Sequence, residues 1–463
     1  MDIMPFLNRD LDVPLYQQLY QFFKENMHEG RIQKGIKLPS KRLLATQLSI
    51  SQTTVERAYE QLAAEGYIVS KPRSGWFAAY NESDFVHVKM PGTLSNKPKG
   101  QENEQSIDFH YGNVDSTHFP FSAWRKSMVS SLGQYGQQLY QPGNILGELE
   151  LRTLIAEYLY YSRGVHCQPE QIIIGAGSPV LMHILCQVFG PNICIGFEDP
   201  GSSRSRRIFE ANHMKILPIP VDDEGICIKN LRKERPSLLY VTPSHQFPLG
   251  TIMTINRRIQ LLKWAAENQS LIIEDDYDGE FRYSGQPIPS LQGLDHHNCV
   301  IYMGTFSKSL LPSLRISYMV LPSSLLEKAS EITSLYKQTV SCHNQLTLAE
   351  FIKKGDWQKH INRMRKLYQK KRAILLEALQ SELGEQVRIR GENSGLHILL
   401  DVYSPFSEKE LIEKAKGEGV KIYPASPFYK NDPPTATVLI GFAGVSEDDI
   451  QEGIKKLKAA WEI

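Results

Sequence analysis

The chain has 463 residues, too many for one hydrophobic core, and a prior of ~100–200 residues per domain predicts about two to four domains. Its charged and apolar fractions, 22% and 41%, are those of an ordinary globular protein, and a net charge of +1 indicates no particular partner. The six cysteines are scattered without a Cys-x-x-Cys pair, which argues against a disulfide framework or a zinc site and favours a reducing compartment.

The sequence shows no targeting or membrane segment. Met1–Pro5 lacks a basic region followed by an apolar one, so no signal peptide is predicted. No apolar run approaches the ~18 residues that a membrane span requires. We therefore expect a cytoplasmic protein that contacts no membrane, and the residue pattern predicts no metal site.

Three helices followed by a β-hairpin are predicted within residues 1–80. The first helix begins after Pro14, the second after Ser40, and the third after Ser51, a favoured N-cap residue. The sequence at 67–78 then has the pattern of strand, turn and strand. This order of elements is that of a winged helix-turn-helix, although a small helical docking domain would share the same pattern.

Positive charge favours the DNA-binding interpretation. Between residues 30 and 55 there are five basic residues and no acidic one, as expected for contacts to phosphates. The third helix carries four polar residues near its start that can reach base edges or phosphates from a major groove: Gln52, Thr53, Thr54 and Arg57. The tip of the hairpin adds Lys71 and Arg73.

Residues 38–45, 51–55 and 58–67 resemble the GntR-type DNA-binding domain. The resemblance implies that the segment around Pro39-Ser40, the start of the third helix and the wing contact DNA. The expected DNA-binding residues are Ser40, Lys41, Arg42, Gln52, Thr53, Thr54, Arg57, Lys71, Arg73 and Gly75.

Residues 81–106 are predicted to be a linker. Periodicity fades there, and proline, glycine, asparagine and glutamine are frequent. A flexible connection of about 25 residues would let the first domain move relative to the rest, or cross to a partner subunit.

From residue 107 onward, short apolar runs alternate with helical patterns. Strands are predicted at 172–174, 193–197, 238–241, 271–273 and 300–303, and helices at 149–161 and 180–189. Such alternation predicts an α/β body over residues 107–321, with a mostly parallel sheet covered on both faces. A smaller α+β part is predicted over residues 322–463, with helices at 323–337 and 357–383 and strands at 395–402, 421–423 and 437–442.

Two of these strands end in reactive polar residues. Asp275 and Tyr277 follow the run at 271–273, and the run at 300–303 is followed by Lys308. Thr305, Ser307 and Arg315 flank that lysine. Sites in open α/β sheets form outside the carboxyl ends of parallel strands, so we expect these groups to converge. A lysine for an aldehyde, a carboxylate for a pyridine nitrogen, and hydroxyls with an arginine for a phosphate suit pyridoxal 5′-phosphate (PLP).

A glycine turn at 175–179 directly follows a predicted strand and opens a helix. Backbone amides and the helix dipole at such a turn favour an anion, and Gly177 and Ser178 are the candidate contacts. Pro179 supplies no N–H there, so the turn alone is a weak signal and the neighbouring Ser307, Lys308 and Arg315 strengthen it.

Segments 273–278 and 304–321 resemble the fold-type I, aspartate-aminotransferase-like domain. With the GntR-type head, the whole chain resembles the MocR/GabR subfamily of bacterial transcription regulators. The resemblance implies a Schiff base between PLP and Lys308, a pairing of Asp275 with the pyridine N–H, and a hydrogen bond from Tyr277 to the ring hydroxyl. The implied phosphate ligands are Arg315, Thr305, Ser307, Gly177 and Ser178. The family also forms head-to-tail homodimers.

Three features depart from the family pattern. Ser202 stands where an aromatic residue is common, and Pro179 stands where a glutamine is common. In fold-type I aminotransferases the small part normally supplies an arginine that clamps an amino-acid carboxylate, but this chain has no arginine after Arg390. We therefore expect an intact cofactor site with unusual ligand recognition, in which Arg204 and Arg206 are candidate effector contacts.

These features predict a cytoplasmic, PLP-dependent transcription regulator that senses a small ligand and binds operator DNA. The effector is either PLP itself or a small amine or amino acid. The alternative is an active aminotransferase with an accessory DNA-binding module, and a third hypothesis is a scaffold with a vestigial PLP site. His245 and Gln246 fit loop-stabilising roles and ligand contacts equally well.

Overall fold

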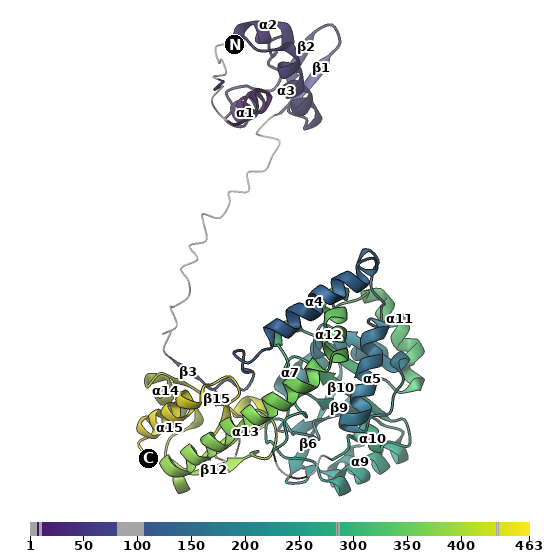
Figure 1. Ribbon diagram of the computed structural model, residues 1–463, viewed down its shortest axis with the longest axis vertical. Coiled ribbons are helices and arrows are strands. Elements are labelled where there is room, and N and C mark those ends of the chain that lie inside the picture. Colours follow the sequence, from purple (N-terminus) through teal and green to yellow (C-terminus); the bar gives the residue numbers. More distant parts are fainter. Residues whose placement is uncertain are drawn as a thin grey trace. The chain divides into compact units, whose positions relative to one another are not determined.

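The computed structural model describes residues 7–8, 12–80, 106–283, 285, 288–431, 433 and 435–463. It divides into two compact units, Met1–Gln101 and Glu102–Ile463, and each is described by itself (Figure 1). The predicted linker at 81–106 lies outside the described residues, apart from Ser106. Among the residues described, no helix is both long and apolar enough to cross a membrane.

The first unit is the predicted winged helix-turn-helix. Its elements are α1 (Leu15–His28), α2 (Lys41–Leu48), α3 (Gln52–Ala64), β1 (Ile68–Lys71) and β2 (Gly75–Ala78). Serine caps start two of the helices: the Ser40 hydroxyl accepts a hydrogen bond from Leu43 N at 3.2 Å, and the Ser51 hydroxyl accepts one from Thr54 N at 3.1 Å. The strands pair antiparallel and form the wing.

Apolar side chains at helical spacing hold this unit together. Leu19 and Phe23 of α1 pack with Val55 and Tyr59 of α3, and all four are at most 1% exposed. The Tyr59 hydroxyl also donates to the Pro39 carbonyl at 3.0 Å, so α3 is tied to the residues that precede α2.

The second unit contains an eight-stranded sheet in the order β4-β11-β10-β9-β8-β5-β6-β7. The strands are β4 (Ile172–Gly175), β5 (Cys194–Asp199), β6 (Lys215–Asp222), β7 (Gly225–Ile226), β8 (Leu238–Val241), β9 (Leu271–Asp276), β10 (Val300–Thr305) and β11 (Ser317–Val320). β10, β9, β8, β5 and β6 are parallel neighbours, whereas β11 runs antiparallel between β10 and β4. The mostly parallel sheet is confirmed; β6, β7 and β11 were not predicted.

Helices cover both faces of this sheet, as successive residues of β4 demonstrate. Ile172 and Ile174 pack in one hydrophobic cluster with Ile155 of α5 (Leu149–Arg163), while Ile173 packs in another with Leu185 of α6 (Ser178–Phe189). The helices of this part are α4 (Phe121–Tyr135), α5 (Leu149–Arg163), α6 (Ser178–Phe189), α7 (Ser203–Ala211), α8 (Ile228–Glu234), α9 (Ile255–Asn268), α10 (Leu291–Leu294), α11 (Leu326–Tyr336) and α12 (Cys342–Lys353).

The smaller part has a four-stranded antiparallel sheet in the order β12-β13-β16-β15. Its elements are α13 (Asp356–Glu382), β12 (Val387–Arg390), β13 (His397–Val402), α14 (Glu408–Gly417), β14 (Val420–Lys421), β15 (Tyr423–Pro424), β16 (Thr437–Gly441) and α15 (Glu447–Trp461). The single strand predicted at 421–423 is two short strands, because β14 leaves the sheet to pair with β3 (Ile107–Asp108). Residues 107–108 therefore pair with the smaller part.

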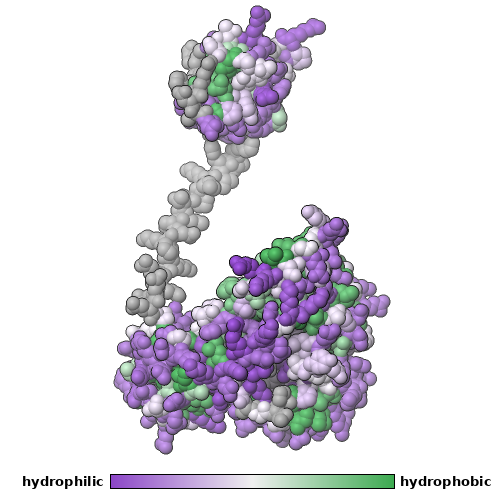
Figure 2. Space-filling view, in the orientation of Figure 1, coloured by the Kyte–Doolittle hydropathy of each residue, from purple (hydrophilic) through white to green (hydrophobic). Residues whose placement is uncertain are grey.

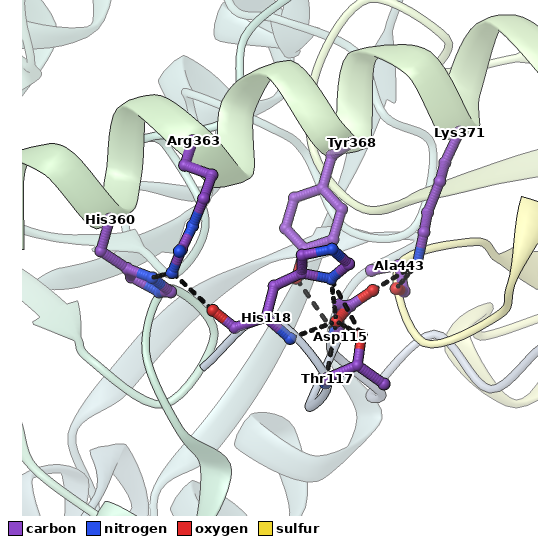
Figure 3. A network of polar contacts seen from close by, with 8 residues as sticks. All are labelled: Asp115, Thr117, His118, His360, Arg363, Tyr368, Lys371 and Ala443. Carbon is purple, nitrogen blue, oxygen red and sulfur yellow. Dashed lines mark hydrogen bonds and ion pairs between the residues drawn. The ribbon is translucent and has the colours of Figure 1, made fainter. Parts of the chain in front are cut away.

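A buried polar network joins the chain that follows β3 to α13 and to the loop after β16 (Figure 3). The Lys371 ammonium lies 2.7 Å from a carboxylate oxygen of Asp115 and donates to the Ala443 carbonyl at 3.0 Å. The other Asp115 oxygen accepts hydrogen bonds from Thr117 and His118. Three stretches far apart in the sequence are thus held at one point.

Candidate functional site

A cavity of about 460 Å³ lies in the second unit at the carboxyl ends of β8, β9 and β10. Six of the eight predicted cofactor contacts line it: Lys308, Asp275, Tyr277, Arg315, Ser307 and Ser178. A larger hollow of about 1000 Å³ over residues 402–410 contains none of these groups in its lining. The predicted side chains at the strand ends therefore line one cavity.

Lys308 follows β10 and turns its side chain into this cavity. Its Nζ donates to the Tyr111 carbonyl at 2.9 Å. Burial lowers the pKa of Lys308 to about 8, although the nearby Asp278 carboxylate opposes the shift. A larger share of the amine is therefore neutral near pH 7 than for an exposed lysine, as a nucleophile requires.

Asp275 is buried at the end of β9, and one of its carboxylate oxygens accepts a hydrogen bond from the Tyr240 hydroxyl. Burial raises its pKa to about 6, the Tyr240 hydrogen bond lowers it, and the charges of Asp276 and Asp278 raise it further. Within the described part of the chain, no cation forms an ion pair with Asp275. A buried carboxylate in this state would be stabilised by a cationic ligand group such as a protonated ring nitrogen.

Tyr277 belongs to a hydrogen-bonded chain with His245 and Asp278. The Tyr277 hydroxyl donates to the His245 carbonyl at 2.9 Å and lies 3.0 Å from His245 Nδ1, which is 2.9 Å from Asp278 Oδ2. His245 does not line the cavity, and this arrangement favours the loop-stabilising role that the sequence left open. His245, Asp278 and His397 offer metal-ligand atoms within 4.8 Å of one another. His245 Nδ1 pairs with Asp278 and His397 Nε2 with the Pro248 carbonyl, whereas His245 Nε2 is buried without a hydrogen-bond partner among the described residues.

The glycine turn and Arg315 lie close together at the cavity, and we call them, with Ser307, the candidate anion cradle. Gly177 has φ +93°, and a Cβ there would lie 2.1 Å from Nη2 of Arg315, so only glycine fits. Ser178 begins α6, and the hydroxyl of Ser307 is buried without a hydrogen-bond partner among the described residues. Amides at a helix start, an unpartnered hydroxyl and a guanidinium are the donors that a phosphate requires.

The remaining predicted site residues lie around this centre. The Thr305 hydroxyl accepts hydrogen bonds from Ser307 N at 3.2 Å and from the Ser317 hydroxyl at 2.8 Å, so it shapes the turn before Lys308. Arg204 lines the cavity and is exposed. Arg206 does not line it and donates to the Pro427 carbonyl at 3.4 Å.

In the first unit, eight of the predicted DNA contacts are exposed: Ser40, Arg42, Gln52, Thr53, Arg57, Lys71, Arg73 and Gly75. Lys41 differs from them, because its Nζ lies 2.6 Å from the Glu56 carboxylate and its charge is balanced within the fold. Ser40 and Thr54 take part in the helix caps. Side chains from α2, α3 and the wing are thus available on the surface of a winged helix-turn-helix.

Comparison with known proteins agrees with this division. Residues 15–78 match the family of bacterial regulatory proteins of the gntR type, and residues 105–457 match aminotransferase class I and II. The probable rhizopine catabolism regulatory protein MocR of Rhizobium meliloti is 33% identical, over 99% of this chain and 96% of its own. The chain belongs to the MocR-type transcription regulators.

Other relatives of this MocR-type regulator carry similar names. An uncharacterized HTH-type transcriptional regulator, YdeL, of Bacillus subtilis (strain 168) is 79% identical over the full length of both chains. The HTH-type pyridoxine biosynthesis transcriptional regulator PdxR of Corynebacterium glutamicum is 29% identical, over 97% of this chain and 96% of its own.

The second unit of the MocR-type chain has the aminotransferase fold. The kynurenine aminotransferase of Pyrococcus horikoshii, solved in complex with PMP, matches with a TM-score of 0.72 and 29% identity, over 78% of this chain and 92% of that one. LysN, the α-aminoadipate aminotransferase of Thermus thermophilus, matches with a TM-score of 0.71 and 26% identity, over 77% and 92%. The predicted fold class is confirmed.

Several residues of the site were missed from the sequence. Tyr240, which donates to Asp275, is hidden in the apolar run of β8. Tyr111, which accepts from Lys308, lies 197 residues away along the chain. Asp278 was noted only as part of a motif, and its bond to His245 depends on how two loops pack.

Proposed function

We propose that this regulator binds PLP in the cavity around Lys308 and that the cofactor site controls binding of operator DNA by the first unit. The convergence of a lowered-pKa lysine, a buried carboxylate and the candidate anion cradle on one cavity supports the proposal most strongly. When bound, PLP supplies an aldehyde that condenses with primary amines and a ring that withdraws electrons.

Different residues of the cavity would bind different parts of PLP. Lys308 would provide the amine for the aldehyde, and Asp275 would hold a proton on the ring nitrogen. Tyr277 would hydrogen-bond the ring hydroxyl. Arg315, Ser307 and the turn at Gly177-Ser178 would bind the phosphate, with Thr305 keeping the turn in shape.

The visible absorption of the full chain mixed with PLP tests this assignment. We expect a protein-dependent cofactor band in the wild type and in Lys263→Ala, whose side chain is 72% exposed, but not in Lys308→Ala. A band of equal strength in Lys308→Ala would contradict the role of this lysine, and no band in any variant would contradict PLP binding.

For a ligand to change DNA binding, it must bind two conformations of the protein with different affinities. Two effectors are compatible with the site: PLP itself, or a small amine or amino acid that competes with Lys308 for the aldehyde, with Arg204 or Arg206 as a further contact. Titration of cofactor-free protein with PLP, while binding of a labelled duplex is followed, separates them. No change on PLP addition would remove PLP as the effector.

We also propose that the protein is a cytoplasmic, head-to-tail homodimer. Helix α4 carries three exposed apolar side chains, Phe121, Val129 and Leu132, and Figure 2 shows apolar surface along this helix. A patch of this kind favours association with another protein surface. Analytical ultracentrifugation of the full chain should give twice the mass of 52.7 kDa, and a monomer at micromolar concentration would contradict the dimer.

The competing function is an active aminotransferase with an accessory DNA-binding module. The shared fold favours it, as does the 28% identity to aromatic-amino-acid aminotransferase 1 of Thermococcus litoralis, over 73% of this chain and 84% of that protein. Multiple-turnover transamination of a common amino acid by the PLP-loaded chain would support this function over pure sensing.

A further inference from the structure

One wall of the cavity is aromatic. Tyr111, Phe247 and Phe428 all line it, and each packs against the other two. The ring centroids of Phe247 and Phe428 are 4.8 Å apart, and those of Tyr111 lie 5.6 Å and 6.0 Å from them. We call these three residues the aromatic wall.

The structure behind the aromatic wall is apolar as well. Leu399, Ala425 and Leu439 form a cluster with Phe428, and each of the three is 0% exposed. Tyr111 and Phe247 pack against this cluster. An ion placed against the wall would therefore lose water on a surface that offers no charge in return.

The imidazoles next to the aromatic wall do not supply a positive charge. The ring of His397 lies 5.3 Å from that of Phe247, and its Nε2 donates to the Pro248 carbonyl at 3.1 Å. Burial lowers the pKa of His397 well below the ordinary value. Burial also lowers the pKa of His110, which stacks on Tyr111 at 4.8 Å. Both rings are therefore mainly neutral near pH 7.

No guanidinium group offers a buried, unpaired positive charge at the aromatic wall among the described residues. Arg390 of the smaller part pairs with Asp401 at 2.7 Å, and Arg315 belongs to the candidate anion cradle. Arg204 lines the cavity and its charge acts on Tyr111, but its side chain is exposed, where water screens that charge. On the acidic side, Asp278 is close enough to Lys308 to influence its pKa, and it would repel a second carboxylate.

Lys308 lies directly beside the aromatic wall, because its Nζ bonds to the carbonyl oxygen of Tyr111 at 2.9 Å. An amine that exchanges with Lys308 would therefore carry its nearest substituents into this apolar region. Exchange replaces one carbon–nitrogen bond with another: the incoming nitrogen bonds to the aldehyde carbon, and its two protons pass to the departing lysine nitrogen. No electrons are transferred overall, so no oxidant is required.

We propose that the effector is a primary amine with an apolar or aromatic body and no carboxylate on the carbon next to its nitrogen. Arylalkylamines and alkylamines belong to this class, whereas α-amino acids do not. The inference rests on the proposed function, because it assumes that PLP occupies the cavity, and it names the ligand class that the same site accepts.

Phenethylamine and L-phenylalanine test this proposal, since they share a benzyl body and differ by the α-carboxylate. Each is titrated into the PLP-loaded full chain while the cofactor absorption is followed. We expect phenethylamine to act at a concentration at least about tenfold lower, as expected for one buried charge without a partner. Equal or tighter binding of phenylalanine would overturn the inference.

Two variants test which side chains contact the body of the amine. Phe428→Ala should weaken phenethylamine by about tenfold while methylamine is affected little, because methylamine lacks the body that contacts the aromatic wall. Arg204→Ala should leave phenethylamine unchanged. If phenylalanine binds tightly to the wild type and loses that affinity in Arg204→Ala, a carboxylate contact at Arg204 replaces our proposal.

The cofactor band distinguishes failure of PLP binding from failure of the proposed effector class. A PLP band that no amine perturbs would overturn the effector class while PLP binding stands. The absence of any PLP band would contradict the proposed function and, with it, the effector class. A retained band in Phe428→Ala shows that this variant is folded.

Discussion

Asp275 is the residue on which the cofactor assignment depends most, because a buried carboxylate without a cation is unfavourable until a ligand supplies one. Asp275→Asn keeps the shape of the side chain and removes its charge. We expect PLP affinity to fall by about tenfold or more, since the ring nitrogen loses its partner. Equilibrium dialysis measures this change; Asp223→Asn, a substitution of an exposed aspartate, should have no effect.

The reactivity of Lys308 should depend on pH in a defined direction. Burial holds its pKa at about 8 instead of the ordinary value near 10.4, so its neutral fraction rises steeply as pH increases from 6 to 8. Stopped-flow rates of PLP capture should follow that rise and level off above about pH 8. Rates that keep increasing tenfold per pH unit to pH 10, as for a free lysine derivative measured in parallel, would contradict the lowered pKa.

At the level of single residues, the sequence predicted those that lie at strand ends and belong to short motifs. Lys308, Asp275, Tyr277 and Arg315 are of this kind. Their partners could not be predicted, because Tyr111 and Tyr240 are placed by tertiary packing and look like ordinary core tyrosines in the sequence. The aromatic wall is also assembled from three distant segments.

Among the elements, α13 carries the clearest test of stability, the buried pair of Lys371 and Asp115 (Figure 3). Burial alone would raise the pKa of Asp115, but hydrogen bonds from Lys371, Thr117 and His118 lower it below its usual range. The pair therefore stabilises the fold above the unfolded pKa of about 3.9, and this contribution is lost as pH falls through the lower folded value.

Lys371→Ala leaves Asp115 buried without a cation, and we expect the free energy of unfolding to decrease by about 3–5 kcal/mol. The neighbouring Lys370 provides a matched control, because it pairs with Glu447 at 2.6 Å while 64% exposed. Lys370→Ala should change stability by at most about 1 kcal/mol. Urea denaturation measures the free energy of unfolding of both variants. Equal decreases in the two variants would show that the buried Lys371–Asp115 pair stabilises the fold no more than the exposed pair does.

Helices and strands whose apolar residues recur at a regular spacing, or form one continuous run, were predicted from the sequence. Elements that lack such spacing were not predicted. α1 and α3 follow a helical spacing of apolar residues, and β9 and β10 are continuous apolar runs. β6 was missed because Pro218 and Pro220 argue against a strand. The two prolines are tolerated because β6 lies near the edge of the sheet. Its outer neighbour, the short β7, pairs only with Val221 and Asp222 and so requires no N–H from Pro218 or Pro220. β11 was missed because the same segment contains the Lys308 motif.

For the whole molecule, the DNA-binding unit should show an electrostatic component in its affinity. Arg42 is exposed on α2 and should contact a phosphate, so Arg42→Ala should weaken binding of different duplexes about equally. The slope of log affinity against log salt should become shallower by about 1. Lys263→Ala removes the same charge from the second unit and serves as control; an unchanged slope in Arg42→Ala would place the DNA contact elsewhere.

The overall plan of the chain was predictable because each unit has its own signature: a basic helix-turn-helix pattern before residue 80, and strand ends with reactive groups after residue 107. The fold class follows from those two patterns together, and the regulator family was predicted from the resemblance of the motifs within them. The ligand class did not follow from the sequence, because it depends on which side chains surround Lys308 in space.

The central claim is that occupancy of the Lys308 cavity changes DNA binding. Fluorescence anisotropy of a duplex selected by the full chain from a random library tests it, with cofactor-free, PLP-loaded and phenethylamine-treated protein compared. We predict that the midpoint differs by about fivefold or more between at least two of these states in the wild type, and that it stays constant in Lys308→Ala. One midpoint for all three wild-type states would contradict the account.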